Sequence, residues 1–215
     1  MRTVHIVGGF PSYISLFKEQ GWSVVDCIED ADLVQFCGGE DVWPGFYKEK
    51  AHEHTNFNLK RDRYEKAMFQ LALEFDCAIA GICRGAQFVY VMNGGTLYQH
   101  VDNHGLRNGH YSILVDEHRD LYPNPVHCSS THHQMMREGE GVVVLYAKQS
   151  TVKHGQTGAL CAEEHFVRDV EAVYHEKTRS FCYQPHPEYH MIGNPCRVLY
   201  FRLMKRLILL KGEKK

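Results

Sequence analysis

The chain has 215 residues, of which 44% are hydrophobic and 23% charged, as expected for one globular α/β domain with a sizeable core over residues 1–215. Its formal net charge of −2 argues against a basic surface for nucleic acid or anionic lipid, and no apolar run approaches the roughly 18 residues that a membrane span requires. We therefore expect neither a nucleic acid nor a membrane as a partner.

The cysteines and histidines of the sequence predict a reducing compartment and no metal site. The eight cysteines include no Cys-x-x-Cys pair, and the N-terminus has no charged region followed by a long apolar stretch, so we expect reduced thiols and a cytoplasmic location. Without paired cysteines or a His-Glu-x-x-His motif, the sequence predicts no metal and no other cofactor. The fifteen histidines nevertheless include three close pairs, His52/His54, His132/His133 and His186/His190.

The N-terminal residues alternate between strand and helix signals. Residues 3–8 predict a strand, residues 11–20 a helix that Gly21 ends, and residues 22–27 and 32–37 two further strands. The last of these strands stops at Gly38 and Gly39. Because ligands bind beyond the carboxyl ends of parallel strands, we expect Gly38 to lie against the substrate and the N–H of Gly39 to face an oxyanion. Taken alone, the glycine pair is also compatible with an ordinary turn.

The next segment leads to a candidate nucleophile. Residues 40–60 are polar, aromatic and irregular, and we expect them to form a rim or lid over the site. Apolar residues at helical spacing predict a helix over residues 61–75. A buried strand over 78–82 then leads to Cys83, and another helix is predicted over residues 86–92, where Asn93-Gly94-Gly95 ends it.

Cys83 occupies the corner between this strand and this helix, with Gly81 and Gly85 on either side. Such a corner is typical of a nucleophile elbow, in which small residues leave room beside the nucleophile. The N-terminal end of the helix and the cation of Arg84 favour the thiolate, and the N–H of Arg84 is the natural second oxyanion donor. The short pattern alone is equally compatible with a buried cysteine at a tight turn.

The second half of the chain is richer in strand signals. Strands are predicted over 111–117 and 142–147 with a loop over 127–136 between them, then a hairpin over 170–176 and 178–183, and a closing helix over 195–210. The predicted fold class is α/β: a single flavodoxin-like domain with a mostly parallel central sheet, flanking helices, the nucleophile elbow and a small added antiparallel strand region.

His186 and Glu188 follow the predicted hairpin, about a hundred residues after Cys83. On extended backbone, residues i and i+2 point to the same side, so Glu188 can hold the ring of His186 while the other ring nitrogen faces Cys83. The three residues together predict a catalytic triad of nucleophile, general base and orienting acid.

These motifs resemble those of class I glutamine amidotransferases, and further stretches resemble the gamma-glutamyl hydrolase-like branch of that family. In chain order the stretches are residues 38–44 (GGEDVWP), 61–65 (RDRYE), 94–100 (GGTLYQH), 130–134 (STHHQ) and 170–172 (VEA). The resemblance implies that the amino-acid end of the substrate is gripped by Gln87 and by the backbone of Ser130, Thr131 and His132. A polar surface loop is the alternative for His132 and His133.

One residue departs from the family pattern. Pro185 precedes His186, where the family more often has an aromatic or aliphatic residue. Proline holds Gln184 in extended backbone and removes an N–H donor, which suits the end of a strand but could shift the histidine.

The resemblance implies hydrolysis of a γ-glutamyl amide through a thioester on Cys83, with a small-molecule γ-glutamyl compound as the substrate. Three functions remain open from the sequence. The chain is a free-standing hydrolase, a glutaminase subunit that delivers ammonia to a separate synthetase, or a non-catalytic binding protein. Since no Gly-x-x-x-x-Gly-Lys-Ser/Thr segment is present, any ATP-dependent synthetase must be another chain.

Overall fold

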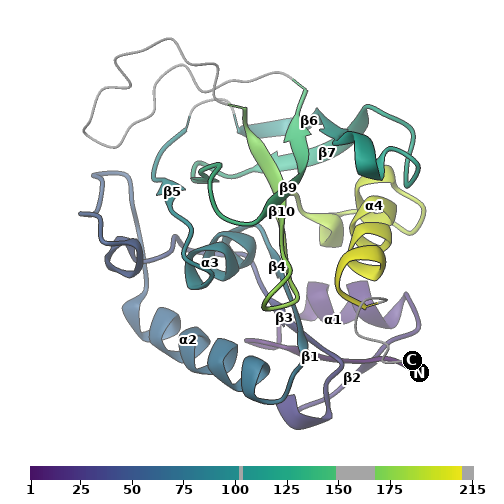
Figure 1. Ribbon diagram of the computed structural model, residues 1–215, viewed down its shortest axis with the longest axis horizontal. Helices are drawn as coiled ribbons and strands as arrows, with labels where there is room; N and C mark the ends of the chain where they lie inside the picture. The colour runs from purple at the N-terminus through teal and green to yellow at the C-terminus, as the bar shows by residue number, and fades with distance from the viewer. Residues whose placement is uncertain (102–103, 149–167, 210–215) are drawn as a thin grey trace.

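The computed structural model describes residues 1–101, 104–148 and 168–209. Its main feature is a nine-stranded sheet in the order β2-β1-β3-β4-β11-β10-β9-β6-β7, beside which β5 and β8 form a separate antiparallel pair (Figure 1). The strands are β1 (Thr3–Ile6), β2 (Ser23–Val24), β3 (Leu33–Phe36), β4 (Ala78–Ile82), β5 (Leu97–Tyr98), β6 (Gly105–Leu114), β7 (Val126–Thr131), β8 (Met135–Met136), β9 (Val142–Ala147), β10 (Val170–His175) and β11 (Ser180–Tyr183).

Strand β11 joins two differently built halves of this sheet. From β2 to β11 every neighbouring pair is parallel, whereas from β11 to β7 every pair is antiparallel. Tyr183 at the end of β11 pairs with Ile82 at the end of β4, so the segments that follow these two strands leave the sheet side by side. The central strands β3 and β4 are buried along their whole length, as expected for parallel strands covered on both faces.

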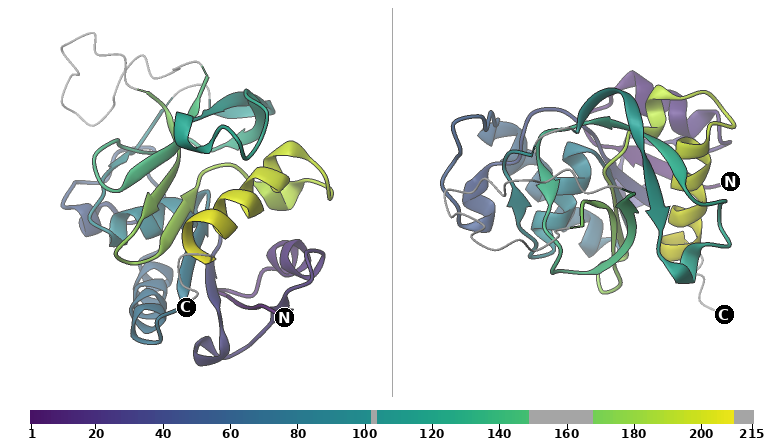
Figure 2. Two further views of the ribbon diagram at one scale, coloured as in Figure 1. Left: turned by 45° about the vertical axis from the view of Figure 1, so that its right-hand side comes forward. Right: turned by 90° about the horizontal axis from the view of Figure 1, so that it is seen from above.

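Helices cover both faces of the parallel half (Figures 1 and 2). Helices α1 (Pro11–Lys18) and α4 (Pro195–Met204) pack on one face, and α2 (Leu59–Glu74) and α3 (Arg84–Met92) pack on the other. Asn58 caps α2 and Asn194 caps α4, each accepting a hydrogen bond from a backbone N–H of the first turn. Short 3₁₀ helices span Ile28–Asp30, Pro44–Tyr47, Asp116–His118 and Pro187–Tyr189, and a π-helical turn spans Lys205–Leu209.

The predicted α/β fold class is confirmed, and the predicted hairpin is present as β10 and β11. The predicted small antiparallel region is present as β5 and β8, and the antiparallel strands β10, β9, β6 and β7 also extend the main sheet. Two helices begin two residues earlier than predicted, at Leu59 and Arg84. The closing α-helix stops at Met204 and continues as the π turn to Leu209, so the predicted end at residue 210 lies outside the described residues.

The loop predicted over residues 127–136 is wrong, because this segment contains most of β7 and all of β8. In β7, buried residues alternate with exposed or half-buried ones, but two of the buried residues are Cys128 and Ser130. A polar residue on the inward face hides the period-2 signal from a reading based on hydrophobicity. Among the described ranges, no helix is long and apolar enough to cross a membrane.

Candidate active site

Cys83 sits between β4 and α3 with backbone angles φ 52° and ψ −115°, a conformation that side-chain-bearing residues rarely adopt. The flanking glycines make this corner possible. A Cβ atom on Gly81 would lie 2.3 Å from the carbonyl oxygen of Gly85, and one on Gly85 would lie 2.3 Å from the carbonyl oxygen of Phe36. The structure therefore has the elbow geometry that the sequence predicts, with only 7% of Cys83 exposed.

His186 reaches the site from the end of β11, next to β4. The backbone N–H of Cys83 donates to the carbonyl of Tyr183, which ties the elbow to the strand that carries the histidine. The ring Nδ1 of His186 lies 2.6 Å from Oε1 of Glu188, and this hydrogen bond to a carboxylate leaves Nε2 for the sulfur. The ring also stacks on Tyr189 with 4.3 Å between centroids. Pro185 has therefore not moved the histidine away from its acid.

Gly38 lies where Cys83 and His186 meet. A Cβ atom at this position would lie 3.2 Å from Cε1 of His186 and 3.7 Å from Cβ of Cys83. The N–H of Gly38 donates to the hydroxyl of Tyr13 at 2.8 Å. Burial and the nearby carboxylate of Glu188 both raise the pKa of that Tyr13 hydroxyl, so it stays protonated. Gly38 thus lets the sulfur and the imidazole approach each other across a position that has no side chain.

The charge state of His186 follows from its neighbours. Burial alone would lower its pKa, but the negative charges of Cys83 and Glu188 outweigh burial and raise the pKa of His186 to about 11. The ring is therefore an imidazolium at neutral pH, between the sulfur of Cys83 on one side and the carboxylate of Glu188 on the other.

A buried ion network supports the loop opposite the elbow. Arg61 donates to Oε1 of Glu65 at 2.8 Å and to the carbonyl oxygens of Cys37 and Gly38 at 3.1 and 2.9 Å. A Cβ atom on Gly39, whose φ is 140°, would lie only 2.2 Å from this guanidinium. Arg61 therefore holds the main chain around Gly39, and only glycine fits there.

The side chain of Arg84 has a structural role that the sequence did not predict. It is 2% exposed and forms ion pairs with Asp62 and Glu65 of α2. Its charge is matched by these two carboxylates, so the nearby cation that the sequence predicts is already paired with α2. The backbone of Arg84 nevertheless begins α3 directly after Cys83, where the predicted oxyanion donor belongs.

A cavity of about 190 Å³ opens beside Cys83. Its lining brings together most of the predicted site residues with several that the sequence did not single out: Gly39, Glu40, Asp41, Asn56, Cys83, Arg84, Gln87, Thr131, His132, His133 and Gln134. The hydrogen bond that His133 donates to Asp41 raises the pKa of His133, with 3.1 Å between Nε2 and the carboxylate. The rim of the cavity is therefore polar and carries carboxylates.

The predicted substrate contacts divide into two groups. Gln87, Thr131 and His132 line the cavity, although the amide of Gln87 already donates to the carbonyl of Gln134 at 2.8 Å. Ser130, predicted to contribute its backbone, does not line the cavity, and its hydroxyl donates to the carbonyl of His104 at 2.7 Å. A surface loop is excluded for His132, which is 6% exposed and whose pKa is lowered by burial.

Two residues that hold the triad in place were missed at the level of sequence. Tyr13 on α1 and Ser129 on β7 hydrogen-bond to the backbone of Gly38 and His186, respectively. Neither belongs to a recognisable motif. Three residues of the Arg-Asp-x-Tyr-Glu stretch, Arg61, Asp62 and Glu65, contribute to the ion network, although in the sequence this stretch shows only a family resemblance.

Comparison with known proteins gives consistent matches. The family model described as Peptidase C26 matches residues 1–188. A protein named as glutamine amidotransferase-like, the YvdE homologue of Lactococcus lactis subsp. cremoris, is 31% identical over 157 residues, which are 61% of this chain and 84% of that protein.

Solved structures share the fold at low sequence identity. A chain from Thermoplasma acidophilum that is assigned to GMP synthase has a TM-score of 0.64 at 13% identity, and the match covers 98% of this chain and 96% of that one. PurLQS from Thermotoga maritima has a TM-score of 0.63 at 16% identity, with 96% and 98% covered.

Proposed function

From the premise that this chain belongs to the peptidase C26 family, which is glutamine amidotransferase-like, we propose that it hydrolyses the γ-glutamyl amide of glutamine or of another γ-glutamyl compound. The observation that carries the proposal is the arrangement of three side chains. Cys83 lies at a strained elbow, and Glu188 holds the ring of His186. The ring faces Cys83 on the other side of Gly38, which has no side chain. A nucleophile, a base and an orienting acid are the three groups that acyl transfer through a covalent intermediate requires.

The reaction begins with attack of the Cys83 thiolate on the amide carbonyl. Charge that develops on the carbonyl oxygen is stabilised by the backbone N–H groups of Gly39 and Arg84 at the rim of the cavity. The imidazolium of His186 then protonates the departing nitrogen, and ammonia or an amine leaves a thioester behind. Neutral His186 next takes a proton from water, whose oxygen attacks the thioester and regenerates the thiolate. Glu188 keeps the ring oriented through both steps.

The size and charge of the cavity suit a γ-glutamyl group. Its volume of about 190 Å³ is below the roughly 300–1,000 Å³ of sites for drug-sized ligands, so it suits a group of amino-acid size. The carboxylates of Glu40 and Asp41 at the rim complement the α-ammonium of such a group. We propose Gln87, Thr131 and His132, which also line the cavity, as further substrate contacts.

Steady-state ammonia release from L-glutamine tests this proposal, with Cys83→Ala as the matched control. We expect turnover by the wild-type chain and none by the variant, while circular dichroism shows that both are folded. Equal turnover by the two proteins would contradict the thioester mechanism.

A second candidate is a glutaminase subunit that passes ammonia to a separate synthetase. It is favoured by the similarity in fold to PurLQS and to the chain assigned to GMP synthase, although identities of 16% and 13% carry only the fold. Ammonia release that is slow for the isolated chain, and that rises when a co-purifying ATP-dependent protein is added, would favour this second candidate. Robust turnover by the isolated chain would favour the hydrolase.

A further inference from the structure

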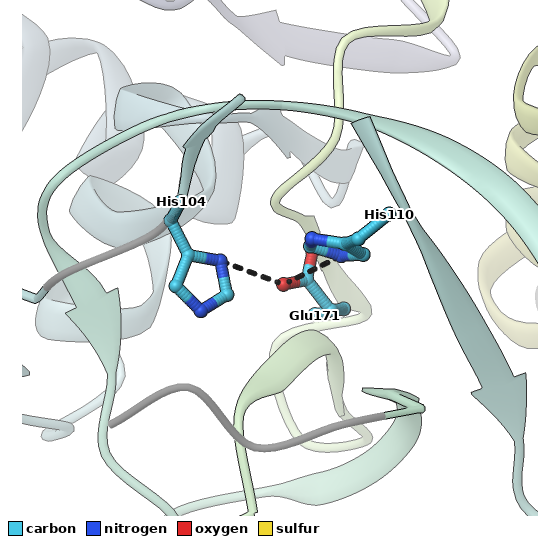
Figure 3. Close-up of side chains that lie close together, drawn as sticks. All are labelled: His104, His110 and Glu171. Carbon is cyan, nitrogen blue, oxygen red and sulfur yellow. Dashed lines mark ion pairs between the residues drawn. The ribbon is translucent and has the colours of Figure 1, made fainter. Parts of the chain in front are cut away.

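Three side chains far from Cys83 in sequence form a buried cluster behind the wall of the cavity. His104 precedes β6, His110 lies on β6 and Glu171 lies on β10 (Figure 3). Nδ1 of His104 is 3.6 Å and Nε2 of His110 is 3.2 Å from Oε1 of Glu171. One ligand atom from each residue lies within 4.8 Å of the other two. The mechanism proposed above uses none of them.

The protonation of His104 is set by its other contacts. Its Nε2 lies 2.9 Å from a carboxylate oxygen of buried Asp169, so this nitrogen carries a proton that it donates. The nearby hydroxyl of Ser130 gives its proton to the carbonyl of His104 and not to the ring. In the neutral ring, Nδ1 then has a lone pair directed toward Glu171. A carboxylate behind an imidazole is the usual support of a metal-bound histidine.

His132 also has a ring nitrogen without a proton near the carboxylate of Glu171. Its Nδ1 lies 2.8 Å from the carbonyl oxygen of Gln134, and since a carbonyl can only accept, Nδ1 carries the proton. Nε2 is therefore an acceptor. It is buried without a hydrogen-bond partner and lies 3.8 Å from Oε1 of Glu171. The rings of His104 and His132 are 4.5 Å apart between centroids.

Glu171 is the centre of this arrangement and is fully buried. Neither of its carboxylate oxygens has a hydrogen bond of normal geometry. A cation among Glu171 and the imidazole nitrogens would satisfy these buried polar atoms together. In a tetrahedral zinc site with bonds of about 2.1 Å, neighbouring ligand atoms are about 3.4 Å apart. The three nitrogens lie 3.2, 3.6 and 3.8 Å from the shared oxygen.

We propose that this cluster is a structural site for a divalent transition metal, and that the metal is Zn²⁺. The ligands are Nδ1 of His104, Nε2 of His110 and Oε1 of Glu171, with Nε2 of His132 as the fourth donor. Three imidazoles and one carboxylate suit Zn²⁺ in a closed tetrahedral site. The ion would tie β6 and β10 to the segment around His132, which lines the catalytic cavity.

The metal content of the purified chain tests the proposal independently of enzymatic activity. The measurement is made in the Cys83→Ala background, so that the thiolate of Cys83 and His186 cannot bind zinc themselves. After reconstitution with ZnCl₂ and gel filtration, we expect about one zinc per chain by mass spectrometry. The stoichiometry should fall to near zero in His110→Ala and Glu171→Gln. It should be unchanged in His127→Ala, which removes an exposed histidine from the neighbouring strand β7.

Two further measurements keep the test decisive if Glu171→Gln does not fold. Zinc should raise the melting temperature of the parent protein by about 5 °C or more, and EDTA should reverse the change. Cobalt(II) in place of zinc should give the visible absorption of a tetrahedral site. His110→Ala, at a side chain that is 15% exposed, should abolish both effects. A parent protein that retains no zinc, or zinc binding that is unaffected in His110→Ala, would overturn the proposal and leave protonated histidines as the partners of Glu171.

Discussion

The hydroxyl of Ser129 accepts a hydrogen bond at 2.8 Å from the backbone N–H of His186, although 57 residues separate the two in the chain. Ser129 lies on β7, the outermost strand of the antiparallel half of the sheet. His186 is thus held from both sides, by Glu188 through its ring and by Ser129 through its main chain.

Ser129→Ala should lower kcat and leave KM nearly unchanged. Ser129 does not line the cavity, so the substitution removes positioning and not substrate contact. The hydroxyl also donates to the carbonyl of His186 at 3.3 Å, and loss of the shorter of the two hydrogen bonds alone, at about 1 kcal/mol, corresponds to a roughly fivefold slower reaction. Steady-state kinetics with glutamine would measure the effect, and His127→Ala on the same strand is the control. An unchanged kcat would show that the bond does not position His186.

Removing the side chain of the nucleophile should relieve strain. Cys83 has φ 52° and ψ −115°, where glycine is far better tolerated than alanine. Cys83→Gly should therefore be more stable than Cys83→Ala by about 1 kcal/mol or more, although both variants are inactive. Urea denaturation of the two proteins gives the difference directly. Equal stabilities would mean that the elbow relaxes when the sulfur is removed.

The pKa of His186 should depend on the thiolate. In the wild type the pKa is raised to about 11, against the lowering effect of burial, by the charges of Cys83 and Glu188. Cys83→Ala removes the first of these charges, so the imidazolium should lose its proton at a lower pH than in the wild type. Side-chain ¹⁵N NMR of histidine across a pH titration would follow the ring. Coincident titration curves for the two proteins would rule out the ion pair.

Asp62→Ala should strongly destabilise the fold. Asp62 is fully buried and pairs with Arg84 under the elbow, so its removal leaves a buried guanidinium with part of its charge uncompensated. Breaking such a pair costs about 3–5 kcal/mol of unfolding free energy.

Asp120→Ala is the matched control for this change, because it breaks the exposed pair with Arg206 and should alter stability little. Chemical denaturation of both variants would compare the two pairs. Similar losses for the two would mean that Glu65 alone compensates Arg84.

The arrangement of Cys83, His186 and Glu188 could be predicted from the sequence because each of its parts has a local signature. Two glycines around a cysteine at a strand end specify the elbow, and a carboxylate two residues after a histidine specifies the orienting pair. The fold class followed from alternating strands and helices in the first half of the chain.

The features that the sequence did not predict, strand β7 and the cluster around Glu171, depend on contacts between segments that are far apart in the chain. Strand β7 was not recognised because Ser130 is polar yet buried, and its burial depends on a hydrogen bond to His104, 26 residues earlier. The cluster around Glu171 could not be predicted from the sequence for the same reason. His104 and Asp169, which are hydrogen-bonded, are 65 residues apart and share no motif. Spacing along the chain carries no information on such pairs until the register of the sheet is known.

The pairing of β11 with β4 has a consequence for how folding of this protein can be followed. A shift of that register by one residue would turn every side chain of β11 to the opposite face and carry His186 away from Cys83. Chains with mispaired strands would thus contribute no turnover at all, rather than a slower rate. The recovery of enzymatic activity during refolding would therefore count the molecules that have joined these two strands correctly, which bulk spectroscopic signals of secondary structure cannot do.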